Sequence, residues 1–326
     1  MAGAAPAAGG GASRNPRNPQ MLSFLNRHRL AIGLTVLAAV TAYGLRAFFH
    51  EDWRGALAFW QGRLWVLGAG LALHGLDLSI EGCLWAAMLA VFGVRLPVRR
   101  IPAVFFSGFA GSLMPVQLGR LIRCEQISRM GLGRFGDVLR AEVILGGLGA
   151  LGGLAVMAGA LVMSRVPWAG VPLMFLAPPA ALWLASWVWS LLPLSARAFP
   201  GETLRKPAVL AVSCLTPVGW ILNSLVLHLV IRGSAPPYPL WQVIFMPPSY
   251  MLLGTASGVP GGVGVVETLL GATLVRWISL PDAHVLLAVA AFRLITFWVW
   301  VGVGWLALLR VLRWPAAPAA APGKES

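Results

Sequence analysis

Long apolar runs separated by short polar segments make up most of the chain. Runs of about 20 residues or more, the length that a helix needs to cross a bilayer, predict six membrane spans, at residues 30–49, 64–93, 135–163, 170–192, 207–231 and 283–312. Two further apolar regions, 101–131 and 239–277, are interrupted by proline and glycine, which break helices. We predict that each forms a re-entrant hairpin, whereas simple hydropathy would count their halves as spans and give about eight.

The two interrupted regions share a sequence pattern. Both contain Ser-x-x-Pro-x-x-x-Gly, from Ser112 to Gly119 and from Ser257 to Gly264, at an offset of 145 positions. Each interrupted region follows the second span of a group of three, and corresponding spans lie at a similar offset. Because each unit crosses the membrane an odd number of times, the second unit must be inverted. The sequence therefore predicts an all-α polytopic membrane protein with two inverted repeats, 30–163 and 170–312, each of three transmembrane helices and one re-entrant broken helix.

Composition and charge agree with a membrane protein. The chain has 326 residues, of which 58% are hydrophobic and 11% charged, so a soluble globular protein is excluded. The formal net charge of +14 comes from basic residues in short loops, which indicates topology signals and anionic-lipid contacts and not nucleic-acid binding. With the N-terminus in the cytoplasm, fifteen of twenty assigned Lys and Arg residues lie inside. We expect a membrane domain at 25–315 and disordered cytoplasmic tails at 1–24 and 316–326.

One predicted span carries a polar stripe. His74, Asp77 and Glu81 are spaced i, i+3, i+7 and therefore share one helical face. Ionisable groups inside a bilayer are costly unless they are paired or hydrated. Such a stripe could have a functional role, as a proton relay or a binding site for a cationic headgroup. Alternatively, it pairs with arginines of neighbouring spans and only fixes packing. The sequence leaves these two alternatives open.

The first interruption is followed by two arginines. A helix should begin after Pro115 to Gly119, and Arg120 and Arg123 would lie in its first turn. Free backbone N–H groups, the positive end of the helix dipole and two guanidiniums together suit a lipid phosphate. The alternative is that both are ordinary cytoplasmic arginines at the end of a loop.

The second interruption ends on a carboxylate. Its residues Pro260, Gly261, Gly262 and Gly264 precede Glu267. Glu267 is expected to be part of the site, where it balances Arg293 or Arg140 or acts as a proton-coupled carboxylate. The simplest account of Arg140, Glu142 and Arg293, near the starts of the third and sixth spans, is mutual ion pairing across the repeat interface.

Sequence signals for catalysis and for cofactors are lacking. The chain has no Ser-His-Asp arrangement, zinc spacing, Walker loop or nucleotide fingerprint. Its three cysteines, Cys83, Cys124 and Cys214, show no disulfide or metal spacing. We expect no catalytic residue, no metal and no cofactor, and hence no enzyme.

The two interruptions also carry a family resemblance, over roughly residues 25–315. Together with Ala291 to Trp298, they resemble the flippase-like, lysylphosphatidylglycerol synthase transmembrane-domain family of bacterial membrane proteins. The second interruption of that family reads Pro-Gly-Gly-x-Gly-x-x-Glu and is matched from Pro260 to Glu267. The first reads Pro-x-x-x-Gly-Glu with a following Arg, and here Arg120 stands where glutamate is usual. The resemblance implies a flippase domain without the soluble synthase domain.

The leading hypothesis is an inner-membrane protein that binds and translocates an anionic phospholipid or a lipid-linked intermediate. The phosphate would bind at the first interruption, and Glu267 with Asp77 or Glu81 would couple movement to protons. The alternative is an accessory membrane subunit of a separately encoded lipid-modifying or glycosyl-transferring enzyme. A lipid-modifying enzyme with its own membrane site is least favoured, because no nucleophile and base stand out.

Overall fold

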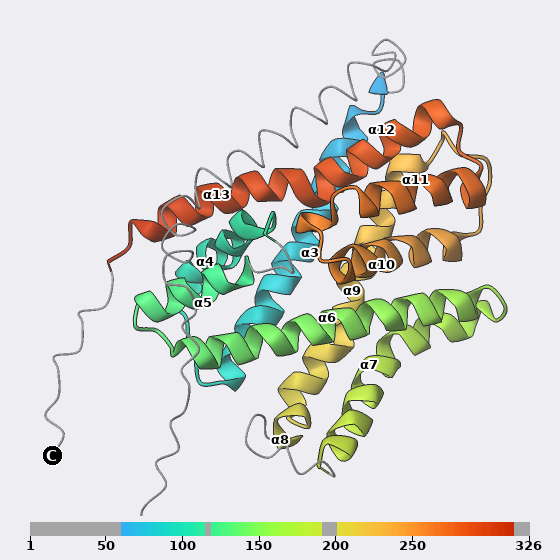
Figure 1. Ribbon diagram of the computed structural model, residues 1–326. Helices are drawn as coiled ribbons and strands as arrows, with labels where there is room; N and C mark the ends of the chain where they lie inside the picture. Colours follow the sequence, from blue (N-terminus) through green and yellow to red (C-terminus); the bar gives the residue numbers. More distant parts are fainter. Residues whose placement is uncertain (1–59, 115–118, 191–200, 316–326) are drawn as a thin grey trace, which may run out of the picture. The chain divides into compact units, whose positions relative to one another are not determined.

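The computed structural model describes residues 60–114, 119–190 and 201–315, and every regular element in these ranges is helical (Figure 1). This confirms the predicted all-α class. In chain order the elements are α3 (Leu64–Val91), η1 (Val98–Arg100), α4 (Ile101–Ser107), η2 (Gly108–Gly111), α5 (Arg120–Arg129), α6 (Phe135–Met163), α7 (Pro167–Ser190), α8 (Gly201–Leu204), α9 (Pro207–Ile231), α10 (Leu240–Ala256), η4 (Pro260–Gly262), α11 (Val265–Ile278), α12 (Asp282–Arg293), η5 (Leu294–Trp298) and α13 (Val299–Leu312).

Six stretches of helix among the described residues are long and apolar enough to cross a membrane. Five of them coincide with predicted spans, namely Leu64–Val91, Phe135–Met163, Pro167–Val188, Pro207–Ile231 and His284–Leu312. The remaining predicted span, 30–49, lies outside the described residues, and so do both predicted tails. The sixth stretch, Pro260–Ile278, falls in the second interrupted region and is not one continuous helix, because it joins η4 and α11 across the non-helical residues Gly261 and Gly264.

The helices of the interrupted regions are short. At 1.5 Å per residue, α10 and α11 are about 26 and 21 Å long, whereas the hydrocarbon core is about 30 Å thick. In the first region α4 has 7 residues and α5 has 10. The helices α10 and α11 pack against each other, as do α4 and α5. These lengths suit re-entrant hairpins better than full crossings, and the re-entrant arrangement stays a prediction.

In each predicted repeat, a long helix packs against the hairpin of the other repeat. Helix α6 of the first repeat packs against α10 of the second hairpin, and α13 of the second repeat packs against α4 and η2 of the first hairpin (Figure 1). Helices α3 and α9, which hold corresponding positions in the repeats, pack along each other. A twofold relation between the repeats would produce this pattern. The packing supports the predicted inverted repeat without establishing the inversion.

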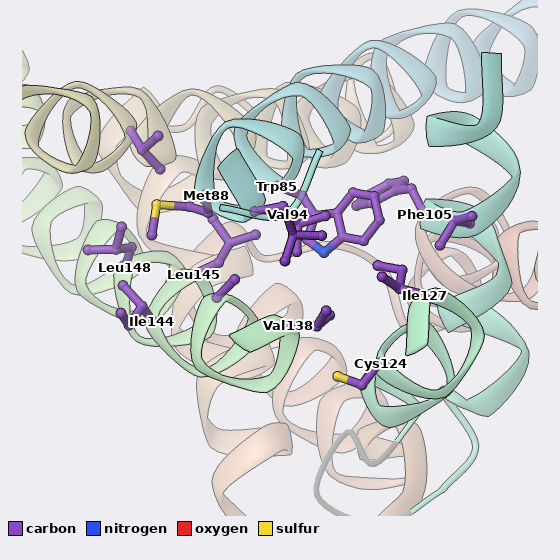
Figure 2. Close-up of a cluster of buried hydrophobic side chains, with 14 of the residues drawn as sticks. Trp85, Met88, Val94, Phe105, Cys124, Ile127, Val138, Ile144, Leu145 and Leu148 are labelled. Carbon is purple, nitrogen blue, oxygen red and sulfur yellow. The ribbon is translucent and has the colours of Figure 1, made fainter. Parts of the chain in front are cut away.

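A buried hydrophobic cluster positions the first hairpin between α3 and α6. Trp85 from α3 contacts Phe105 from α4, with ring centroids 5.7 Å apart, and Figure 2 shows both beside Ile127 of α5 and Val138 of α6. All four side chains are at most 1% exposed. Burial of large apolar and aromatic side chains fixes the short helices, which are too short to be stable alone.

The first interruption also depends on a close approach between two backbone segments. Gly119 precedes α5 and packs against Gly111 at the end of η2. A Cβ added at Gly119 would lie 2.6 Å from the carbonyl oxygen of Gly111, nearer than real Cβ atoms approach backbone. Glycine is therefore required at this position for packing, whatever its role in ligand binding.

We expect the Gly119→Ala substitution to lower the free energy of unfolding by about 1–3 kcal/mol, because the overpacked backbone must shift. Gly147→Ala is the matched control. A Cβ at Gly147 meets nothing within 4 Å, so the change should raise the free energy of unfolding by about 0.5–1 kcal/mol through lower backbone entropy. Denaturation in detergent, followed by tryptophan fluorescence, measures both. Shifts of the same sign would contradict the close approach.

Candidate functional site

A cavity of about 490 Å³ lies where the two repeats meet. Its lining comes from both interrupted regions and from α3, α6, α9, α12 and η5. Nine of the residues proposed from sequence line it: His74, Asp77, Glu81, Gly119, Arg120, Arg123, Gly261, Gly262 and Arg293. Pro260, Gly264, Glu267, Glu142 and Arg140 do not line it, and Pro115 lies outside the described residues. The structure thus joins the α3 stripe and both interruptions at one place.

Arg123 links α5 of the first hairpin to α4 and α6. Helix α5 begins at Arg120, as expected, and places Arg123 in its first turn with 3% exposure. Its Nε donates to the Phe105 carbonyl oxygen at 2.9 Å, and its Nη1 lies 3.4 Å from Oε1 of Glu142 in α6. The guanidinium carbon lies 4.4 Å from the centre of the Phe105 ring. Glu142 Oε1 also accepts a hydrogen bond from Trp85 Nε1 at 2.6 Å.

Arg293 fastens the second hairpin in a similar way. Its Nε donates to Glu267 Oε1 at 2.6 Å, and its Nη2 donates to the Gly261 carbonyl oxygen at 2.9 Å. Glu267 Oε2 accepts from the backbone N–H of Gly264 at 2.7 Å, which caps the start of α11. Phe297 of η5, a π-helical turn, lies under the Arg293 guanidinium, 4.3 Å from ring centre to guanidinium carbon. Such turns are frequent at functional sites.

The two ion pairs are arranged in opposite ways. In the first repeat the arginine lies on the hairpin and the glutamate on the following helix, whereas in the second repeat Glu267 lies on the hairpin and Arg293 on the following helix. Each pair forms within one repeat. The predicted mutual pairing of Arg140, Glu142 and Arg293 across the repeat interface is therefore wrong.

Arg140 lies outside the site. It pairs with Asp137 at 3.1 Å, and its side chain is 54% exposed. Arg140 and Glu142 are two residues apart on α6, a spacing that points side chains to different sides of a helix. Glu142 consequently faces the buried side, and Arg140 faces the surface.

The α3 stripe meets a partner from α9 that the sequence analysis missed. Asn223 Nδ2 donates to Asp77 Oδ2 at 2.7 Å and to the Gly219 carbonyl oxygen at 2.9 Å. His74 Nδ1 lies 3.2 Å from Asp77 Oδ2. All three side chains are buried. Asn223 lies 146 positions after Asp77, close to the repeat offset, so corresponding positions of the two repeats touch here. The sequence did contain a signal for this contact, because Asn223 is a polar residue inside an apolar span and lies at nearly the repeat offset from Asp77.

Arg120 and Glu81 are the half-buried charges of the cavity. Within residues 60–114, 119–190 and 201–315, neither side chain has a hydrogen-bond or ion-pair partner. Arg120 and Arg123 are the cations that act electrostatically on Glu81, and Asp77 and Glu142 are the anions. Because Arg123 and Arg293 are engaged by Glu142 and Glu267, Arg120 is the guanidinium that the described contacts leave available to a ligand.

Comparison with known proteins gives one family. The sequence model of the family described as lysylphosphatidylglycerol synthase TM region matches residues 30–304. The chain belongs to this family. A search of curated proteins finds no match.

Membership of the lysylphosphatidylglycerol synthase TM-region family confirms the resemblance seen in the two interruptions, and with the six apolar helices it establishes a multi-pass membrane protein. The matched residues include both hairpins and every helix that lines the cavity. For this family member, the candidate site is thus a cavity between apolar helices, with two engaged arginines, one available arginine and an Asp77–Asn223 cluster.

Proposed function

We propose that this protein binds the headgroup of an anionic phospholipid or lipid-linked intermediate in the cavity and moves it between the leaflets. The observation that carries the proposal is the charged cavity itself, which both interrupted hairpins line. A charged headgroup does not enter hydrocarbon without a large free-energy cost. A cavity with guanidinium, carboxylate and amide groups lowers that cost along the path.

Arg120 binds the phosphate in this proposal. Its guanidinium lines the cavity and presents several N–H donors, which suit phosphate oxygens. Arg123 and Arg293 act as positioning residues, because each already bonds a backbone carbonyl and a glutamate. Reciprocal packing of hairpins and helices supports movement of one repeat against the other around this site.

The proposal also places the protein in the bacterial inner membrane with both termini in the cytoplasm, on the basis of the arginine distribution. The lipid leaves the cavity chemically unchanged, so the protein acts as a carrier and not as an enzyme. An accessory role beside a separate lipid-modifying enzyme is the competing outcome.

We expect purified protein in liposomes to make inner-leaflet fluorescent phosphatidylglycerol, or a fluorescent polyprenyl phosphate, accessible to an external quencher. Arg120→Gln should lower the transfer rate about tenfold or more, because a charge-assisted hydrogen bond contributes about 1.5–3 kcal/mol. Arg165→Gln, an exposed residue outside the cavity, should transfer at the wild-type rate. Extraction and mass spectrometry should recover unmodified lipid.

Equal rates for wild type and Arg120→Gln would contradict the role of Arg120. If correctly folded wild type transferred neither probe, carrier function would be rejected and the accessory role favoured.

A further inference from the structure

We propose that the cavity selects a phospholipid with a single phosphodiester charge and a headgroup that carries hydrogen-bond donors, such as glycerol hydroxyls or an ethanolamine ammonium. The phosphate binds Arg120, and the donors bind the acceptors around Asp77 and Asn223. This inference rests on the proposed function and narrows its ligand.

The charges that line the cavity favour a ligand with one negative charge. Once the Arg123–Glu142 and Arg293–Glu267 pairs are set aside, Arg120, Asp77 and Glu81 remain among the charged residues of the described lining, with His74 beside Asp77. One cation thus faces two carboxylates. A ligand with one negative charge pairs with Arg120. A diphosphate would bring further negative charge towards the carboxylates, and like charges repel strongly away from water.

The side chain of Asn223 carries a buried hydrogen-bond acceptor that lacks a partner among the described residues. Asn223 is 5% exposed and lines the cavity, and its Oδ1 has no hydrogen-bond partner among the described residues. Its orientation is fixed, because Nδ2 bonds two acceptors, Asp77 Oδ2 and the Gly219 carbonyl oxygen. A buried polar atom without a partner costs free energy. A donor on the ligand would supply the missing bond.

Several hydrogen-bond acceptors of α3 and α9 belong to residues that line the cavity. Asn223 Oδ1 lies on the side chain that already bonds Asp77, and Glu81 follows Asp77 by about one turn of α3. The residues that carry these acceptors, Asp77, Glu81 and Asn223, therefore line the same cavity as Arg120. The volume of about 490 Å³ lies within the range of roughly 300–1,000 Å³ that is typical of small-molecule sites. Phosphate and donors on adjacent parts of one headgroup satisfy both ends.

Isothermal titration of the full-length protein in detergent with dihexanoyl lipids tests this class. Dihexanoyl phosphatidylglycerol and phosphatidylethanolamine should bind about tenfold tighter, or more, than dihexanoyl phosphatidylcholine, which has the phosphodiester but lacks donors. Farnesyl diphosphate, the diphosphate probe, should bind no tighter than phosphatidylcholine.

Variants separate the two ends of the site. Arg120→Gln should weaken all three phospholipids, whereas Asn223→Leu should weaken phosphatidylglycerol and phosphatidylethanolamine to the level of phosphatidylcholine. Glu81→Gln breaks no hydrogen bond within the described residues, so it keeps the test valid if Asn223→Leu does not fold. It should weaken phosphatidylethanolamine more than phosphatidylglycerol, because an ammonium senses the lost charge more than a hydroxyl does. Arg165→Gln is the control and should bind as wild type.

Two results would overturn the inference: phosphatidylcholine that binds as tightly as the donor-bearing lipids, or farnesyl diphosphate that binds tightest. Either would leave lipid transfer itself untouched. If no lipid bound and no transfer occurred, the proposed function would fail together with the inference.

Discussion

Replacing Arg123 with methionine should lower the free energy of unfolding by about 3–5 kcal/mol, because the change leaves a buried charge without its partner. Glu142 is 2% exposed and, among the described residues, would keep only Trp85 Nε1 as a hydrogen-bond donor. The Phe105 carbonyl oxygen would also lose the hydrogen bond from Arg123 Nε, and it would keep the one from the Gly108 backbone N–H. Methionine is apolar and of similar length, so lost packing contributes little.

A double-mutant cycle isolates the charge effect. Glu142→Gln in the Arg123→Met background should restore much of the lost free energy of unfolding, because no unpaired buried charge then remains. Arg140→Met is the control. It breaks the exposed pair with Asp137 and should change the free energy by about 0–1 kcal/mol. Denaturation in mixed detergent micelles measures Arg123→Met, Glu142→Gln, the double variant and Arg140→Met. Additive losses in the double variant would contradict the ion-pair account.

The sequence predicted the helices well because length and hydropathy alone determine whether a segment suits a bilayer. Five predicted spans are long apolar helices within a few residues of their predicted bounds. The Gly and Pro runs marked the interruptions for a similarly local reason, since Gly119 and Gly261 sit where a side chain would not fit or would be strained. Both signals can be detected without knowing which helices meet.

The partners of the charged residues could be predicted only in part: Glu267 was expected to balance Arg293 or Arg140, and it pairs with Arg293. Arg293 pairs with Glu267 and Arg123 with Glu142 because tertiary packing brings particular faces together. For the same reason, the predicted mutual pairing of Arg140, Glu142 and Arg293 was wrong, because residues close in sequence face different sides of α6. Asn223 was missed because an amide in an apolar span carries no charge signal, although its offset from Asp77 matches the repeat.

If the lipid headgroup passes through the cavity, a side chain that fills the cavity should stop lipid transfer. Gly149 of α6 lines the cavity, and a Cβ at this position meets nothing within 4 Å. A tryptophan there can therefore extend into the cavity. Trp220 Nε1 donates a hydrogen bond to the backbone oxygen of Gly149, and the substitution retains that oxygen. Gly147, two residues earlier, is exposed, does not line the cavity and also has open space.

Lipid transfer by Gly149→Trp and Gly147→Trp in the same liposome assay is thus the most direct measurement. Size-exclusion chromatography and thermal unfolding should first establish that both variants fold as the wild type does. We predict that Gly149→Trp reduces transfer to the rate of protein-free liposomes, while Gly147→Trp transfers at the wild-type rate. Wild-type transfer by folded Gly149→Trp would show that the lipid takes another route and would contradict the account.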